Sequence, residues 1–182
     1  MNKGLHSVRE KSLVFIGFMG VGKTTVAQLV AKKLYRDFID IDQEIEKEFR
    51  MPTTEIFKQF GEETFREREK EYILHYAKQP LKVISVGGGA FMQAEIRNAC
   101  LDHCIVFYLD ITWDSWKDRL NMLIDSRPVL QERAIEDIEA LFHERKSTYE
   151  EHNSKLMTDD FNEEEVANYI IESVKLAWDL YS

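Results

Sequence analysis

The chain has 182 residues, of which 44% are hydrophobic and 31% charged, and its formal net charge is −9 at pH 7. This length predicts a single domain, residues 1–182, with enough chain to bury a core. The acidic balance argues against nucleic acid as the main partner, and no apolar run approaches the roughly 20 residues that cross a bilayer.

Residues 1–11 are polar and lack the apolar segment of a secretory signal, so we expect an extra N-terminal leader on a cytoplasmic protein. Cys100 and Cys104 are the only cysteines of the chain. Their spacing suits neither a disulfide framework nor a four-ligand zinc site, which predicts two reduced thiols.

The strongest signal is a glycine-rich segment behind a short apolar run. Leu13–Ile16 is typical of a buried strand, the segment 17–24 fits the pattern Gly, four residues, Gly-Lys-Thr, and Thr25–Leu34 has helical periodicity. A strand, a glycine loop and a helix form a nest of N–H donors for phosphates. A chance glycine turn is the alternative, which the flanking strand and helix disfavour. The pattern predicts that ATP contacts Gly20, Val21, Gly22, Lys23, Thr24 and Thr25, with Lys23 reaching the β- and γ-phosphates and the Thr24 hydroxyl on Mg²⁺.

Two aspartates follow the next strand. Phe38–Asp42 reads as a strand that ends in Asp40 and Asp42 on one face. Ligands of open α/β sheets bind at strand ends, so one carboxylate could help hold Mg²⁺ while the other accepts the proton of an attacking hydroxyl. A solvated pair that caps the next helix is an equally simple reading.

Helical patterns then cover residues 43–78. We expect Pro52 to end a first helix, Thr53 or the threonine after it to cap a second, Gly61 to end that one, and Glu62–Lys78 to form a longer amphipathic helix.

A second glycine signal follows the apolar strand Val83–Val86. Gly87, Gly88 and Gly89 would let a ligand approach the backbone closely. Alternating patterns continue to the end of the chain and predict a parallel sheet covered on both faces, in one three-layer α/β/α domain. The remaining expected elements are helices at 93–101, 112–122, 134–149 and 163–180, strands at 104–109 and 154–157, and a loop or lid at about 120–133.

Three arginines are candidates for binding an anionic ligand. Arg66 and Arg145 lie on predicted helices, and Arg127 precedes Pro128 in the expected lid. The planar guanidinium suits carboxylates and phosphates, but on glutamate-rich helices most arginines are surface ion-pair partners. Arg127 is better placed, because a lid arginine that closes over a transferring phosphoryl group is a recurring device.

Together these segments resemble the shikimate kinase family. The resemblance rests on the phosphate loop, Asp40-Ile-Asp42, Gly61-Glu62 leading to Phe65-Arg66, Ser85-Val-Gly-Gly-Gly89, Arg127-Pro128 and Arg145, in order from about Ser12 to the C-terminal helix. It implies a P-loop, nucleoside-monophosphate-kinase-like fold with a five-stranded parallel sheet in the order 2-3-1-4-5. It also implies Mg²⁺-dependent transfer of the ATP γ-phosphate to the 3-hydroxyl of shikimate, in the pathway to aromatic amino acids, by a protein that we expect to be a monomer.

The resemblance also implies roles for single residues. Lys23, Asp42 and Arg127 would be catalytic, and Thr24 and Asp40 would lie at the metal. Residues 43–78 would form a substrate-binding subdomain. Asp42 would bind the shikimate hydroxyls, Arg66 and Arg145 would clamp the shikimate carboxylate, Gly87, Gly88 and Gly89 would line its ring, and Arg127 would meet the γ-phosphate.

Two rival functions share parts of this pattern. A related gluconate or nucleoside-monophosphate kinase would keep the phosphate loop without the paired carboxylate clamp. A non-enzymatic ATP-binding protein would bind ATP and Mg²⁺ without releasing ADP, which Lys23, Asp42 and Arg127 together disfavour. The chain also lacks the proline that this family often shows soon after the clamp arginine, since Arg145 is followed by Lys-Ser-Thr-Tyr.

Overall fold

Five parallel strands form one sheet in the order β2-β3-β1-β4-β5, as predicted. A computed structural model of the protein describes residues 7–120, 130 and 133–181. Every residue of β1 is buried, because it is the central strand and its apolar side chains meet helices on both faces. The strands are β1 (Ser12–Ile16), β2 (Asp37–Asp40), β3 (Lys82–Ser85), β4 (Cys104–Asp110) and β5 (Ser154–Met157).

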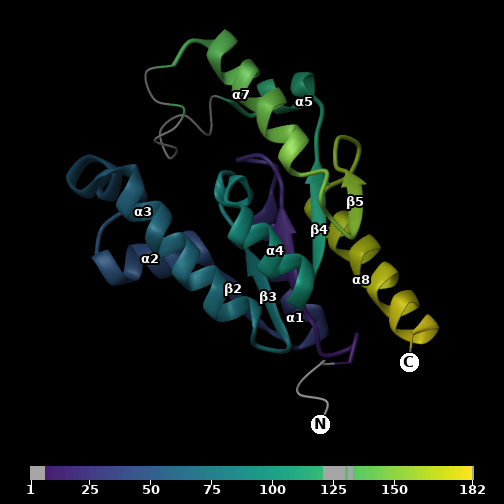
Figure 1. Ribbon diagram of the computed structural model, residues 1–182. Helices are drawn as coiled ribbons and strands as arrows, with labels where there is room; N and C mark the ends of the chain where they lie inside the picture. The colour runs from purple at the N-terminus through teal and green to yellow at the C-terminus, as the bar shows by residue number, and fades with distance from the viewer. Residues whose placement is uncertain (1–6, 121–129, 131–132, 182) are drawn as a thin grey trace.

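Helices cover both faces of the sheet (Figure 1). Helix α1 (Lys23–Leu34) packs against α8 (Glu163–Leu180), while α4 (Ala94–His103) packs on β4 beside α3 (Thr53–Ala77). The start of α8 is fixed by a reciprocal capping box between Asn162 and Glu165, which satisfies two backbone N–H groups. The three-layer architecture inferred from the sequence is therefore confirmed.

Helices α2 (Ile41–Phe49) and α3 extend beyond the β2 edge of the sheet (Figure 1). Gly61 interrupts α3 with non-helical dihedral angles, at the position where the sequence predicts a break. The predicted threonine cap of α3 is wrong. Pro52 occupies the N-cap position, and the backbone N–H and hydroxyl of Thr53 both donate to Glu46 Oε1, each at 2.8 Å.

The second strand is shorter than predicted. It ends at Asp40, and Asp42 lies in the first turn of α2 instead of at a strand end. The cause is local, because the Asp40 side chain accepts a hydrogen bond from the backbone N–H of Gln43 and so starts the helix.

Three short or peripheral elements complete the described part of the fold. Helix α5 (Trp113–Lys117) is shorter than the expected 112–122, because the chain turns at Asp118 and Arg119, where Arg119 N donates to the carbonyl of Trp116. The other elements are α7 (Ile135–Thr148) and the short 3-10 helix η1 (Ala90–Met92) after the triple glycine. Most of the expected lid, including Arg127, lies outside the described residues. Within the described ranges, no helix combines the length and apolarity needed to cross a bilayer.

Candidate active site

The carboxyl ends of β1, β2 and β3 bring the predicted site residues to one edge of the sheet. Ser85 pairs in register with Phe15 on one side and with Asp40 on the other. The phosphate loop follows β1, the aspartates follow β2, and the triple glycine follows β3. Open parallel sheets bind their ligands at this edge.

The phosphate loop wraps the side chain of Lys23, the first residue of α1. Its ammonium group is almost fully buried and donates to the carbonyl oxygens of Gly17 at 2.7 Å and Phe18 at 3.0 Å. The buried indole of Trp116 donates to the carbonyl of Met19 at 2.7 Å, which ties the loop to α5. Beside the loop lies a hollow of about 180 Å³, lined by Gly20, Gly22, Lys23, Thr24 and Thr25, whereas the side chain of Val21 packs into the core.

Three side chains with oxygen atoms that could bind a metal meet next to this hollow. The Thr24 hydroxyl donates to Asp40 Oδ2 at 2.8 Å and lies 3.5 Å from the hydroxyl oxygen of Ser85. Asp40 therefore has the capping role considered for it, because one of its oxygens caps α2, while the other accepts the hydrogen bond from Thr24. The set fits Mg²⁺, a hard cation that takes oxygen ligands and keeps several waters. Across the described part of the chain, no group of three His, Cys, Asp or Glu offers another metal site.

A second hollow, of about 50 Å³, lies between α3 and the glycines. Arg66 projects into it and donates from Nη1 to Glu69 Oε2 at 2.8 Å, while Nε and Nη2 reach Glu62 Oε1 at 3.3 and 3.2 Å. The lining residues are Met19, Asp42, Thr53, Phe57, Phe65, Arg66, Glu69, Gly87, Gly88, Gly89 and Arg145.

Glu69 is a fully buried carboxylate in this hollow. Burial raises its pKa to about 7, although Arg66 opposes the shift by favouring the charged form. The carboxylates of Glu69 and Asp42 both face Gly87, where an added Cβ would lie 2.9 Å from Glu69 Oε1 and 3.1 Å from Asp42 Oδ1.

Arg145 enters the same hollow from α7. It is 6% exposed, and burial lowers the pKa of its guanidinium. Among the described residues no carboxylate forms an ion pair with it, while its guanidinium lies over the ring of Phe18 at 5.9 Å. A Cβ added to Gly88 would lie 3.5 Å from Nη1 of Arg145, and one added to Gly89 would lie 2.6 Å from Nη2 of Arg66. The two guanidiniums therefore flank the glycine segment. A buried cation without a carboxylate partner is suited to an anionic ligand.

The structure adds two residues that sequence reasoning missed. Glu69 lies four positions after Phe65 and four before Ile73, both buried, so its helical position signals burial despite its charge. Tyr149, at the end of α7, donates from its hydroxyl to the carbonyl of Gly88, and no local pattern predicts that contact.

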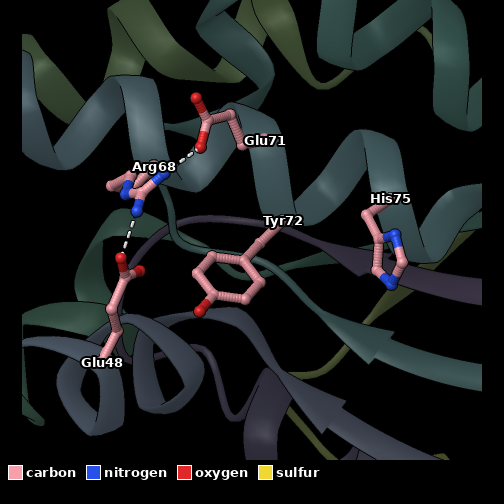
Figure 2. A pocket seen from close by; sticks show the side chains of 5 residues that line it. All are labelled: Glu48, Arg68, Glu71, Tyr72 and His75. Atoms are coloured by element: carbon pink, nitrogen blue, oxygen red, sulfur yellow. Dashed lines mark hydrogen bonds and ion pairs between the residues drawn. The ribbon is translucent and has the colours of Figure 1, made fainter.

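A further hollow between α2 and α3 contains none of the predicted site residues. Figure 2 shows Arg68 held between Glu48 and Glu71, with Tyr72 and His75 beside them. Its one guanidinium already pairs with two carboxylates, whereas Arg145 forms no ion pair among the described residues.

Comparison with known proteins identifies relatives over nearly the whole chain. A sequence model of the shikimate kinase family matches residues 19–175. The chain is 58% identical to a shikimate kinase of Bacillus subtilis over 177 residues, which cover 96% of this chain and 94% of that protein.

Two solved structures bear on the fold. A shikimate kinase from Acinetobacter baumannii in complex with shikimate has a TM-score of 0.84 and 29% identity, covering 92% of this chain and 94% of that one. A gluconokinase from Sinorhizobium meliloti, with a TM-score of 0.53 and 14% identity over 95% of this chain and 97% of that one, shares the fold alone.

Proposed function

The chain belongs to the shikimate kinase family, whose members are ATP-dependent kinases of aromatic amino acid biosynthesis, and we propose that it transfers the γ-phosphate of ATP to the 3-hydroxyl of shikimate with Mg²⁺. The observation that carries this assignment is the hollow in which Arg66 and Arg145 flank the glycine segment, with Asp42 on its wall. Shikimate presents a carboxylate and three hydroxyls, and the hollow offers two guanidiniums and a carboxylate acceptor.

The phosphate loop binds ATP in this proposal. Gly20, Val21 and Gly22 offer backbone N–H groups at the start of α1, and the ammonium of Lys23 moves from its two loop carbonyls to the β- and γ-phosphates. Thr24 and Asp40 hold the metal, and Thr25 lies beside them. Bound Mg²⁺ neutralises charge on the phosphates.

Asp42 orients the acceptor hydroxyl and takes its proton. Its place in the first turn of α2 turns its carboxylate toward Gly87, next to the glycine segment that lines the substrate ring. Phosphoryl transfer needs positioning and charge neutralisation more than covalent chemistry, so one carboxylate suffices as base. Arg127 is proposed to meet the γ-phosphate from the lid, on the strength of its sequence position alone.

Four further proposals rest on sequence. They are a substrate-binding subdomain at residues 43–78, a cytoplasmic location, a monomeric state, and the absence of nucleic acid and membrane partners. The net charge of −9 supports the exclusion of nucleic acid, since the cations of the site are few and enclosed.

Three variants test the residue roles. Asp42→Asn should lower kcat by on the order of 10²-fold or more while leaving ATP binding intact, because general-base contributions have that size. Arg66→Ala and Arg145→Ala should each raise KM for shikimate by about tenfold or more through loss of a charge-assisted hydrogen bond. Unchanged turnover in the first variant removes Asp42 from the mechanism, and unchanged shikimate affinity in the other two removes the clamp.

A further inference from the structure

Asp110 is a buried carboxylate outside the hollow that Arg66, Arg145 and the triple glycine line, which we call the substrate hollow. It is the last residue of β4 and is 3% exposed. Its Oδ1 accepts hydrogen bonds from the Tyr108 hydroxyl and the Ile111 backbone N–H, both at 2.9 Å. Its Oδ2 lies 3.3 Å from the ammonium of Lys146 and 3.2 Å from that of Lys155, as two ion pairs without hydrogen-bond geometry.

The two lysines belong to different elements. Lys155 is on β5, the neighbour of β4 in the sheet, whereas Lys146 is in the last turn of α7. Lys146 directly follows Arg145, and consecutive helix residues point about 100° apart. Lys146 therefore reaches the end of β4 from the same helical turn that directs Arg145 into the substrate hollow.

Helix α7 lies over the carboxyl ends of the strands, away from the faces of the sheet (Figure 1). Phe142 packs it against Phe18, Trp113 and Trp116. Beyond Phe142, the last turn is tied by the Lys146 ion pair to β4 and by the Tyr149 hydroxyl to the carbonyl of Gly88. Together with the Thr148 hydroxyl, which donates to Met92 Sδ at 3.2 Å, these contacts hold the turn that carries Arg145, whose guanidinium pairs with no carboxylate among the described residues.

We propose that Asp110 is a positioning residue for the substrate carboxylate, acting through Lys146 to fix the end of α7 that carries Arg145. This inference rests on the proposed clamp role of Arg145. Loss of the Lys146 contact leaves the chemistry at Asp42 and the phosphate loop in place but lets the guanidinium shift. Displacements of about an ångström in a binding group are costly, so shikimate affinity should fall while ATP affinity is preserved.

The second lysine supplies a matched control. Lys155 meets the same Asp110 oxygen at nearly the same distance and also lies 3.9 Å from Glu150, so its removal deletes at least as much ion pairing. Both lysine side chains are about one-third exposed. Because β5 is held in the sheet by its ladder to β4, losing Lys155 should not move Arg145.

The experiment compares Lys146→Met with Lys155→Met by calorimetric titration of shikimate and by steady-state kinetics. We expect Lys146→Met to weaken shikimate binding by on the order of tenfold, with KM for ATP within about twofold, and Lys155→Met to change shikimate binding less than about twofold. Lys146→Arg, which keeps the charge, should restore most of the affinity. Lys146→Gln, with a polar end group, takes the place of the methionine variant should that variant not fold.

Wild-type shikimate affinity in both methionine variants would overturn the proposal, as would a loss of the same size in both. Arg145→Ala, measured in parallel, distinguishes the positioning role of Lys146 from the clamp role of Arg145. An effect of Arg145→Ala without one of Lys146→Met rejects only the positioning role, whereas no effect of Arg145→Ala rejects the clamp itself.

Discussion

The buried carboxylate of Glu69 makes the stability of the protein depend on pH. Its pKa is about 7 in the folded protein against an ordinary 4.5, chiefly because burial disfavours the charged form. Between these two values the folded state holds more of the proton than the unfolded state does. The contribution of Glu69 to the free energy of unfolding is therefore present below about pH 4.5 and is lost as pH rises toward 7.

Glu69→Gln should remove this dependence. Each pKa unit corresponds to about 1.4 kcal/mol. The free energy of unfolding of the variant, relative to that of the wild type, should therefore rise by up to about 3 kcal/mol from pH 4.5 to pH 7. Urea unfolding across that range measures it, with Glu67→Gln, exposed on the same helix, as the control. A difference between variant and wild type that does not change with pH would contradict the account.

Adjacent glycines of the triple-glycine segment face different neighbours. A Cβ on Gly89 would lie 2.6 Å from Nη2 of Arg66, the end of a flexible side chain, whereas one on Gly88 would lie 2.9 Å from the backbone nitrogen of Met19. Gly89→Ala should therefore raise KM for shikimate with little loss of stability, because only the guanidinium must move.

Gly88→Ala is the matched comparison and should cost about 1–3 kcal/mol of stability as well as ATP affinity, since the phosphate loop must shift. Kinetics and thermal unfolding of both variants measure the contrast. The same changes in KM and stability in both variants would contradict the separate roles of the two contacts.

At the scale of elements, Gly61 joins two helical segments that line one hollow. Its dihedral angles, φ 84° and ψ 160°, belong to a region that is open essentially to glycine alone, and a Cβ there would meet nothing within 4 Å. Thr53 and Phe57 come from the segment before it, and Phe65 and Arg66 from the segment after it. The break therefore determines the relative orientation of the two helical segments that line the hollow.

Gly61→Ala should destabilise the protein by about 1–3 kcal/mol through backbone strain alone, and should raise KM for shikimate as α3 straightens. Denaturant unfolding and substrate titration measure the two effects. The exposed Phe60→Ala, one residue earlier, controls for local loss of packing. Wild-type stability in Gly61→Ala would show that α3 does not depend on the break.

The elements also show what the sequence can and cannot predict. The strand order was expected only from the family resemblance, whereas the phosphate loop and the break at Gly61 were predictable from local signals, namely glycine spacing and helical period. The start of α3 and the end of α5 were not predictable, because contacts with residues outside these helices decide them. Glu46 takes the hydrogen bonds of Thr53, and the buried Trp116 is fixed to Met19.

Prediction of the site has the same limit. The residue types at Asp40, Arg66 and the triple glycine indicate oxygen and anion chemistry, and they do lie together at the carboxyl edge of the sheet. The charges of Glu69 and Asp110 do not reveal their burial, because it depends on how α3 packs against the glycine segment and how α7 and β5 pack against β4.

At the scale of the whole molecule, Arg36 links both ends of the chain at the edge of the sheet opposite the site. Its guanidinium donates to the carbonyls of Lys11 at 2.8 Å and Arg9 at 2.5 Å, and it lies 5.3 Å from the ring centre of Trp178 on α8. Burial lowers the pKa of this guanidinium. Residues 9–11 of the expected leader are thus part of the folded structure.

Arg36→Met should lower the free energy of unfolding by about 1–3 kcal/mol through the loss of two hydrogen bonds and the cation–π contact, with unchanged KM for both substrates. Thermal unfolding and kinetics measure this, and Arg9→Met, which removes an exposed ion pair with Asp179, should have almost no effect. A change in KM would mean that this edge communicates with the site.

The most direct test of the central claim is ADP release by the purified protein with ATP and Mg²⁺, in parallel with shikimate, with gluconate and without an acceptor. Release should be rapid and should depend on shikimate, because in the proposed mechanism Arg66 and Arg145 bind its carboxylate and Asp42 orients its hydroxyl. Release with gluconate but not shikimate, or none with any acceptor despite ATP binding, would contradict it.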